Sequence, residues 1–224
     1  MKLAPLRGEI VAALRRLEAA GLVHGTSGNV SARDRETGLI AVSPTSIGYD
    51  VLEPGDVSVV SEEGELVEGK TPSTELPMHL SILTGRPEAG AVVHTHSPYA
   101  TALGLVVDEI PVLLAEVAAA VGGPIPIVPY APTGERATGE AVLSAGDAWA
   151  AIVRNHGPVC LGRDLGEALR CAFAVEEGAR AFALARAHGE PEKLPEDELE
   201  RLSRLRQRPR ASGTRPGRSR RSRR

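Results

Sequence analysis

The chain of 224 residues has few aromatic residues and few cysteines. Aromatic residues make up 3% of it, so a core drawn from its 42% of hydrophobic residues consists mainly of Ala, Val, Leu and Ile. Two cysteines, Cys160 and Cys171, are too few for a disulfide framework, which favours a protein of the reducing cytoplasm. The fingerprint G-x-G-x-x-G is also absent, so the usual sequence signal of a dinucleotide site is missing.

Long apolar runs are lacking as well. No run reaches the ~20 residues that a membrane-spanning helix needs, so we expect no membrane contact. The first 21 residues carry charges throughout, as in an amphipathic helix rather than a signal peptide.

Acidic residues are absent from the C-terminal end. Residues 201–224 hold 11 arginines and no acid, which leaves 15 basic and 29 acidic side chains, a charge of −14, on the rest. We predict a domain over 1–207 and a disordered Arg-rich tail over 208–224. Such a tail is typical of a solvated extension, which we favour, or of an arm that contacts nucleic acid. No aromatic residue lies among its arginines to stack on bases.

The apolar pattern alternates between helical and strand periodicity along the chain. It predicts helices at 6–20, 73–84, 97–105, 115–122, 137–146, 165–189 and 195–207. It predicts strands or extended segments at 39–46, 56–69, 89–96, 110–114, 125–132 and 148–162. Several strands are joined by short turns, which favours a single α/β domain with a central, mainly antiparallel sheet flanked by helices.

Two histidines stand out in the segment AVVHTHSPYA, residues 91–100. A strand points alternate side chains to one face, so His94 and His96 would project together. Two adjacent imidazoles supply two ligands of a metal site; the alternative is a hydrogen-bonded pair at a strand end. His156, at the end of AAIVRNHG, is placed to reach another strand as a third ligand or to serve as a turn histidine. His79 falls inside a predicted helix.

Three short segments are rich in neutral hydrogen-bond donors: GTSGN (25–29), SPTS (43–46) and PSTE (72–75). Glycine-rich turns and helix starts bind anions through backbone N–H groups, so these segments suit a phosphate ester. Each of them alone is a common turn. Glu75 closes the third segment, at a predicted helix start where Ser73 and Thr74 look like caps.

Together these motifs resemble the class II aldolase/adducin family, and within it the L-fuculose-phosphate aldolases. The resemblance runs through GTSGNVSAR, SPTS, PSTELPMH, VVHTHSPYATAL and NHG in this order and spans about residues 5–190. It implies a zinc- or other divalent-metal-dependent lyase of carbohydrate metabolism, a cytoplasmic homotetramer with sites near subunit interfaces. Its implied reaction cleaves a ketose 1-phosphate reversibly to dihydroxyacetone phosphate and an aldehyde such as lactaldehyde.

The resemblance also assigns roles to residues. It implies that His94, His96 and His156 bind the metal and that Glu75 is the acid–base carboxylate. It places phosphate on a set of small and polar residues: Gly28, Asn29, Thr45, Ser46, Ser73 and Thr74.

One departure concerns the aldehyde-side proton donor. Fuculose-phosphate aldolases have a tyrosine near Ala115, whereas this chain has no Tyr between Tyr99 and Tyr130. Tyr130 and Glu116 are candidate substitutes. The rival activities are a ribulose-phosphate 4-epimerase, which looks for an Asp in that region, a methylthioribulose-phosphate dehydratase, and a non-enzymatic adducin-like protein, which loses the metal histidines.

Overall fold

The N-terminal helix forms where apolar residues recur at helical spacing. In the computed structural model, which describes residues 1–207, α1 spans Ala4–Ala19 and buries Ile10, Leu14 and Leu17 completely. Gly21 follows with a φ of 71°, a backbone conformation that glycine adopts at little cost at the end of a helix. The helix predicted at 6–20 is confirmed.

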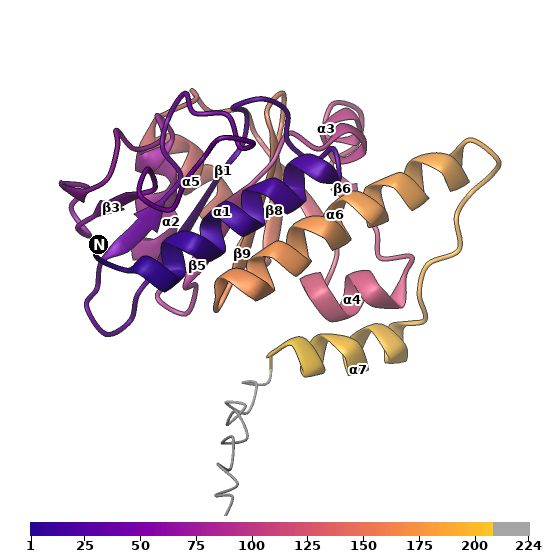
Figure 1. Cartoon of the computed structure of the whole chain (residues 1–224). Coiled ribbons are helices and arrows are strands. Elements are labelled where there is room, and N and C mark those ends of the chain that lie inside the picture. Colours follow the sequence, from indigo (N-terminus) through magenta and orange to yellow (C-terminus); the bar gives the residue numbers. More distant parts are fainter. Residues whose placement is uncertain (208–224) are drawn as a thin grey trace, which may run out of the picture.

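The strands form one nine-stranded sheet in the order β4-β3-β2-β1-β5-β9-β8-β7-β6 (Figure 1). Within the described residues, β7 and β8 pair in parallel and every other neighbouring pair is antiparallel. The prediction of a central, mainly antiparallel sheet is therefore confirmed. The strands span Asn29–Arg33 (β1), Ile40–Val42 (β2), Ser58–Val60 (β3), Leu66–Glu68 (β4), Ala91–His94 (β5), Glu109–Ile110 (β6), Ile125–Val128 (β7), Ala150–Val153 (β8) and Gly157–Gly162 (β9).

Helices cover both faces of this sheet (Figure 1). Alternate strand residues supply the two cores: on β5, Val93 joins the core beneath α1 and α6, whereas Val92 joins the core beneath α2. The other helices are α2 (Leu76–Gly85), α3 (Pro98–Leu103), α4 (Ala115–Val121), α5 (Arg136–Leu143), α6 (Leu165–Arg186) and α7 (Glu196–Gln207). None of the helices in residues 1–207 is both long and apolar enough to cross a membrane.

The predicted start of one helix and the predicted extent of one strand are corrected. The predicted caps Ser73 and Thr74 are wrong, because α2 begins at Leu76 behind a turn in which the Leu76 amide donates to the Ser73 carbonyl. The strand predicted at 110–114 is reduced to Glu109–Ile110, since Pro111 follows and has no N–H to donate to a ladder.

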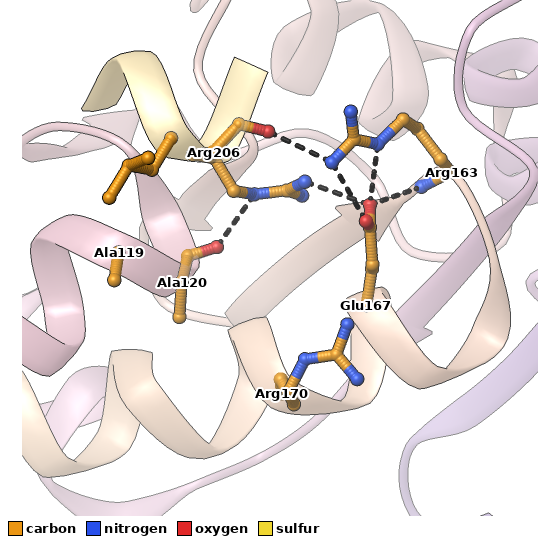
Figure 2. Close-up of a pocket in the computed structure, with 7 residues that line it drawn as sticks. Ala119, Ala120, Arg163, Glu167, Arg170 and Arg206 are labelled. Carbon is orange, nitrogen blue, oxygen red and sulfur yellow. Dashed lines mark hydrogen bonds and ion pairs between the residues drawn. The ribbon is translucent and has the colours of Figure 1, made fainter. Parts of the chain in front are cut away.

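The last helix is fastened by a buried arginine (Figure 2). Arg206 is 6% exposed. Its Nη1 donates to Glu167 of α6 over 2.8 Å, and its Nε donates to the Ala120 carbonyl of α4 over 2.9 Å. Arg163 also donates to Glu167. The guanidinium groups of Arg206 and Arg86 lie 4.2 and 4.4 Å from the ring centroid of Trp149. The predicted disordered tail, 208–224, lies outside the described residues.

Candidate active site

Three histidines reach one place from two neighbouring strands. β5 ends at His94, and the Thr95 amide then donates to the Pro158 carbonyl, which keeps the chain beside β9 as far as His96. His156 lies in the three-residue turn that joins β8 to β9, and this turn interrupts the extended segment predicted at 148–162. Asn155 has a φ of 59°, which lets the chain reverse there. Because β5 and β9 are paired, this turn lies next to the end of β5.

The three imidazoles converge with the carboxylate of Glu75, the residue that precedes α2. His94 Nε2 lies 3.0 Å from His96 Nε2. Glu75 Oε2 lies 3.3 Å from His94 Nε2, and Glu75 Oε1 lies 3.3 Å from His156 Nε2. One nitrogen or oxygen from each of the four side chains lies within 4.8 Å of the others. The structure thus brings together all four residues that the sequence placed at the reacting centre.

The protonation states of this cluster follow from its hydrogen bonds and burial. His94 Nδ1 lies 2.9 Å from the Pro158 carbonyl, which only accepts, so Nδ1 carries the proton and Nε2 turns its lone pair to the cluster. Burial, helped by the neighbouring His156, lowers the pKa of His94 well below its usual value and also lowers the pKa of His96. Both rings are therefore neutral at neutral pH.

The donor set of the cluster fits a divalent cation. Among the described residues, Glu75 Oε1 is buried without a hydrogen-bond partner. A buried carboxylate oxygen and imidazole lone pairs that face one another are costly unless a positive charge lies between them. Three histidines with an additional oxygen donor are a usual set for zinc.

A cavity of about 230 Å³ opens beside the cluster. The three donor-rich segments meet there, since Pro44 pairs with Pro72 and the Thr45 amide donates to the Thr71 carbonyl. Glu75, His96 and His156 line this cavity. So do all six residues to which the family resemblance assigns phosphate binding: Gly28, Asn29, Thr45, Ser46, Ser73 and Thr74.

The backbone of the cavity wall is tightly defined. Gly28 has a φ of 77°, and a Cβ on it would lie 2.8 Å from the His94 carbonyl oxygen, so glycine is required there. Ser46 has a φ of 61°, a backbone conformation that few non-glycine residues adopt. The Tyr49 hydroxyl lies 2.9 and 2.8 Å from the Ser27 and Gly28 carbonyls and holds the glycine turn in place. Burial raises the pKa of Tyr49, so it stays a donor.

Some lining residues were missed from the sequence. Thr26, Ser27 and Pro44 lie inside segments already singled out. Thr133 comes from the turn before α5, which approaches because Gly134 packs against the Thr74 carbonyl, and a single threonine in a turn gives no sequence signal.

Two further histidines, His24 and His188, and the two candidate proton donors lie away from the cluster. His24 follows α1 and His188 follows α6, and neither belongs to the described cluster. Neither Glu116 nor Tyr130, which are exposed, appears among the described residues that line the cavity.

The fold and site define a class of protein: a mixed α/β domain that holds three imidazoles and a carboxylate beside a pocket of neutral hydrogen-bond donors. Residues 8–183 match the family model described as Class II Aldolase and Adducin N-terminal domain. The chain belongs to the class II aldolase and adducin family, which confirms the resemblance in its motifs.

Named relatives in this family include aldolases and L-ribulose-5-phosphate 4-epimerases. The chain is 36% identical over 199 residues to a 5-deoxy-D-ribulose 1-phosphate aldolase of Bacillus thuringiensis serovar kurstaki, covering 88% of this chain and 93% of the relative. It is 37% identical over 198 residues to a 5-methylthioribulose-1-phosphate/5-deoxyribulose-1-phosphate aldolase of Rhodospirillum rubrum, covering 88% and 89%. A solved L-fuculose 1-phosphate aldolase superposes with a TM-score of 0.85 at 30% identity, over 91% of this chain and 97% of that one.

Proposed function

We propose that the protein is a metal-dependent aldolase that reversibly cleaves a ketose 1-phosphate between C3 and C4. The products are dihydroxyacetone phosphate and an aldehyde. The observation that carries the proposal is that Glu75 and three histidines lie beside a pocket of hydroxyl, amide and backbone donors. The predicted class of lyase agrees with the names of the chain's relatives.

The histidines His94, His96 and His156 hold a divalent cation, zinc in the first instance, with Glu75 as a further donor in the absence of substrate. The bound cation supplies Lewis-acid stabilisation of negative charge on substrate oxygens. The His94 and His96 rings are suited to this because they are neutral and do not repel the cation.

The phosphate is held in the cavity by Asn29, Thr45, Ser46, Ser73 and Thr74, with the backbone of Gly28 turned toward it. Apart from Glu75, His96 and His156, no ionisable side chain of the described residues lines this cavity, so neutral donors bind the ester. These contacts lie away from the bond that breaks and supply binding energy and alignment.

Glu75 moves the proton at C3. In the direction of cleavage, the C4 hydroxyl gives its proton to water and becomes the aldehyde carbonyl, and the C3–C4 electron pair remains on C3. Glu75, which has taken up a proton from water, gives it to C3 and completes dihydroxyacetone phosphate. In the reverse direction Glu75 removes a C3 proton from dihydroxyacetone phosphate. This role requires that the Glu75 carboxylate is free to reach C3 when substrate is bound.

The sugar is proposed as a class. L-Fuculose 1-phosphate and 5-deoxyribulose 1-phosphate share carbons 1–3 and differ in the aldehyde half, which would be lactaldehyde or acetaldehyde. The chain lacks the tyrosine expected on that side, and it resembles aldolases named for 5-deoxyribulose phosphate, so we extend the substrate class to 5-deoxypentuloses. Incubation of the protein with dihydroxyacetone phosphate and a panel of aldehydes, followed by identification of the ketose phosphates formed, would show which aldehyde the site prefers.

We also propose that the protein works in the cytoplasm as a homotetramer with sites near subunit interfaces. The support is the family likeness, together with exposed apolar residues after α3, where Leu105 is 50% and Val106 75% exposed. Sedimentation of the full chain tests the tetramer.

Replacement of Glu75 by Gln tests the proposed reaction. Gln preserves shape and removes the base, so exchange of the C3 hydrogen of dihydroxyacetone phosphate with deuterated water should fall by about a hundredfold or more. Bound metal is measured in the same samples. Equal exchange in wild type and Glu75→Gln would assign the base to another residue.

The same assay separates the rivals. An epimerase that breaks and rejoins one carbon–carbon bond need not remove this proton, and an adducin-like protein would show no exchange in the wild type. If the metal-loaded wild type does not exchange the C3 hydrogen of dihydroxyacetone phosphate, the aldolase proposal is rejected.

A further inference from the structure

A line of buried polar side chains leads to Glu75. Ser31 Oγ lies 2.7 Å from His79 Nδ1, His79 Nε2 contacts Asn29 Oδ1, and Asn29 Nδ2 lies 2.7 Å from Glu75 Oε2. All four side chains are buried, and Ser31 and His79 are completely so. The cost of an unpaired polar group is high at such depth, so the direction of each hydrogen bond is constrained.

Chemistry fixes that direction from the carboxylate backwards. An ionised Glu75 only accepts, so the Asn29 Nδ2 amino group donates to it and Asn29 Oδ1 must accept. The donor to Oδ1 is then the Nε2–H of His79. Since burial lowers the pKa of His79 to about 3, its ring is neutral and holds one proton, which leaves Nδ1 to accept from the Ser31 hydroxyl.

Local structure explains how the four residues meet. Asn29 and Ser31 are two apart on β1 and project to one face of the sheet. Glu75 and His79 lie four apart at the start of α2, on one side of the helix. The helix and the strand therefore present one pair of polar side chains each, and the two pairs alternate along the line.

We propose that His79 is a positioning residue for the acid–base step, because its Nε2–H holds the Oδ1 end of the Asn29 amide and so leaves the amino end for Glu75. A flipped amide would turn Oδ1 toward the carboxylate and repel it. In the observed arrangement Asn29 donates to Oε2 of Glu75. Oε1 of Glu75 has no hydrogen-bond partner among the described residues and lies 3.3 Å from His156 Nε2. The inference rests on the proposed role of Glu75 as the base.

It also gives Asn29 a second role. Asn29 lines the phosphate cavity as predicted, yet its amide is already engaged with Glu75 and His79. The amino group has two hydrogens, so it serves Glu75 with one and keeps one for the pocket. Phosphate binding and orientation of the base thus share one side chain.

The test compares three variants on the metal-loaded protein. His79→Leu fills the space and removes both hydrogen bonds, His79→Gln keeps a donor and an acceptor, and Ser31→Ala removes only the outer link. We expect the C3 exchange rate of dihydroxyacetone phosphate to fall about ten- to a hundredfold in His79→Leu, the range usual for partners that orient site residues. The loss should lie mainly in kcat, with metal retained, and His79→Gln should recover most of it. Ser31→Ala should be intermediate.

The control is Ser81→Ala, a buried hydroxyl on the same helix that faces Gly139 of α5; it should exchange at the wild-type rate. Wild-type exchange in metal-loaded His79→Leu would overturn the inference, and a His79→Gln variant as slow as His79→Leu would overturn the donor role. A second measurement covers poor folding of His79→Leu: two-bond proton–nitrogen spectra of wild type should show His79 protonated at Nε2.

The two proposals fail separately. A wild type without exchange rejects the aldolase proposal, and the spectra still decide the hydrogen-bond line. A His79 ring protonated at Nδ1 rejects the line, whatever the activity.

Discussion

Removing the charge of Glu167 should weaken the docking of the C-terminal helix and lower the unfolding free energy by an amount that follows from the pKa of this residue. Burial alone would raise the pKa of Glu167, but hydrogen bonds from Arg163 and the charge and hydrogen bond of Arg206 outweigh it and lower the pKa from 4.5 to about 2. Roughly two and a half pKa units correspond to about 3 kcal/mol of preference for the ionised form in the folded protein. Glu167→Gln should therefore cost about 3 kcal/mol of unfolding free energy at pH 7.

The pH dependence of this cost has a definite sign. The folded pKa lies below the unfolded one, so the stabilisation is fully present above about pH 4.5 and is lost as the pH falls toward about 2. Urea unfolding at pH 7 and pH 3 should show the gap between wild type and Glu167→Gln narrowing on acidification. Both proteins lose bound metal in acid. The difference in unfolding free energy between them at each pH therefore does not include that loss.

The matched control is Glu200→Gln, on the outer side of α7. Its ion pair with Arg204 is 60% and 73% exposed, so its loss should cost about 0.5 kcal/mol or less. A gap for Glu167→Gln that is as small as the control's at pH 7, or that stays the same at pH 3, would refute this account of the helix anchor.

Two further predictions concern the site. We expect the wild type to bind about one zinc per chain and to lose most of it in each of three variants, His94→Ala, His96→Ala and His156→Ala. His79→Ala should lose less zinc. Elemental analysis that finds full metal in the three ligand variants would reject the ligand set. Thr45→Val and Ser73→Ala should raise the Michaelis constant for a ketose 1-phosphate about ten- to a hundredfold, since each removes one hydrogen bond to a charged group; unchanged kinetics in both would move the phosphate elsewhere.

The sequence predicted the fold where local signals were strong. The apolar spacing placed α1 and α6 within a few residues, and in the structure the Asp164 carboxylate caps α6 by accepting from the Glu167 amide. The strand β6 was overestimated because IPVLL reads as a strand by composition, yet pairing with β7 extends only to Ile110. Pairing depends on neighbours that are distant in sequence, and composition alone does not contain them.

One pattern shows how far a motif depends on its fold. GELVEGKT, residues 64–71, has the spacing G-x-x-x-x-G-K-T of a P-loop. In the structure this stretch contains the edge strand β4, which pairs with β3, and α2 does not begin until Leu76. A P-loop requires a strand that leads directly into a helix, so the spacing has no phosphate-binding meaning here.

The reacting centre was predictable as a set of residues but not as an arrangement. The order of motifs selected Glu75 and three histidines, and the structure brings the four together. What no local pattern indicated was the tie between Asn29 and His79, because strand β1 and helix α2 meet only in the folded chain. The same holds for Tyr49, whose hydroxyl secures a turn more than twenty residues earlier.

The stacking around Trp149 has a practical consequence. It is the chain's only tryptophan, and it lies under the guanidinium groups of Arg86 from the α2 end and Arg206 from α7. Neither arginine lines the cavity of the histidine cluster. The intrinsic tryptophan fluorescence of this protein should therefore respond to the docking of the C-terminal helix, and we expect the emission to change on acidification if Arg206 leaves Trp149.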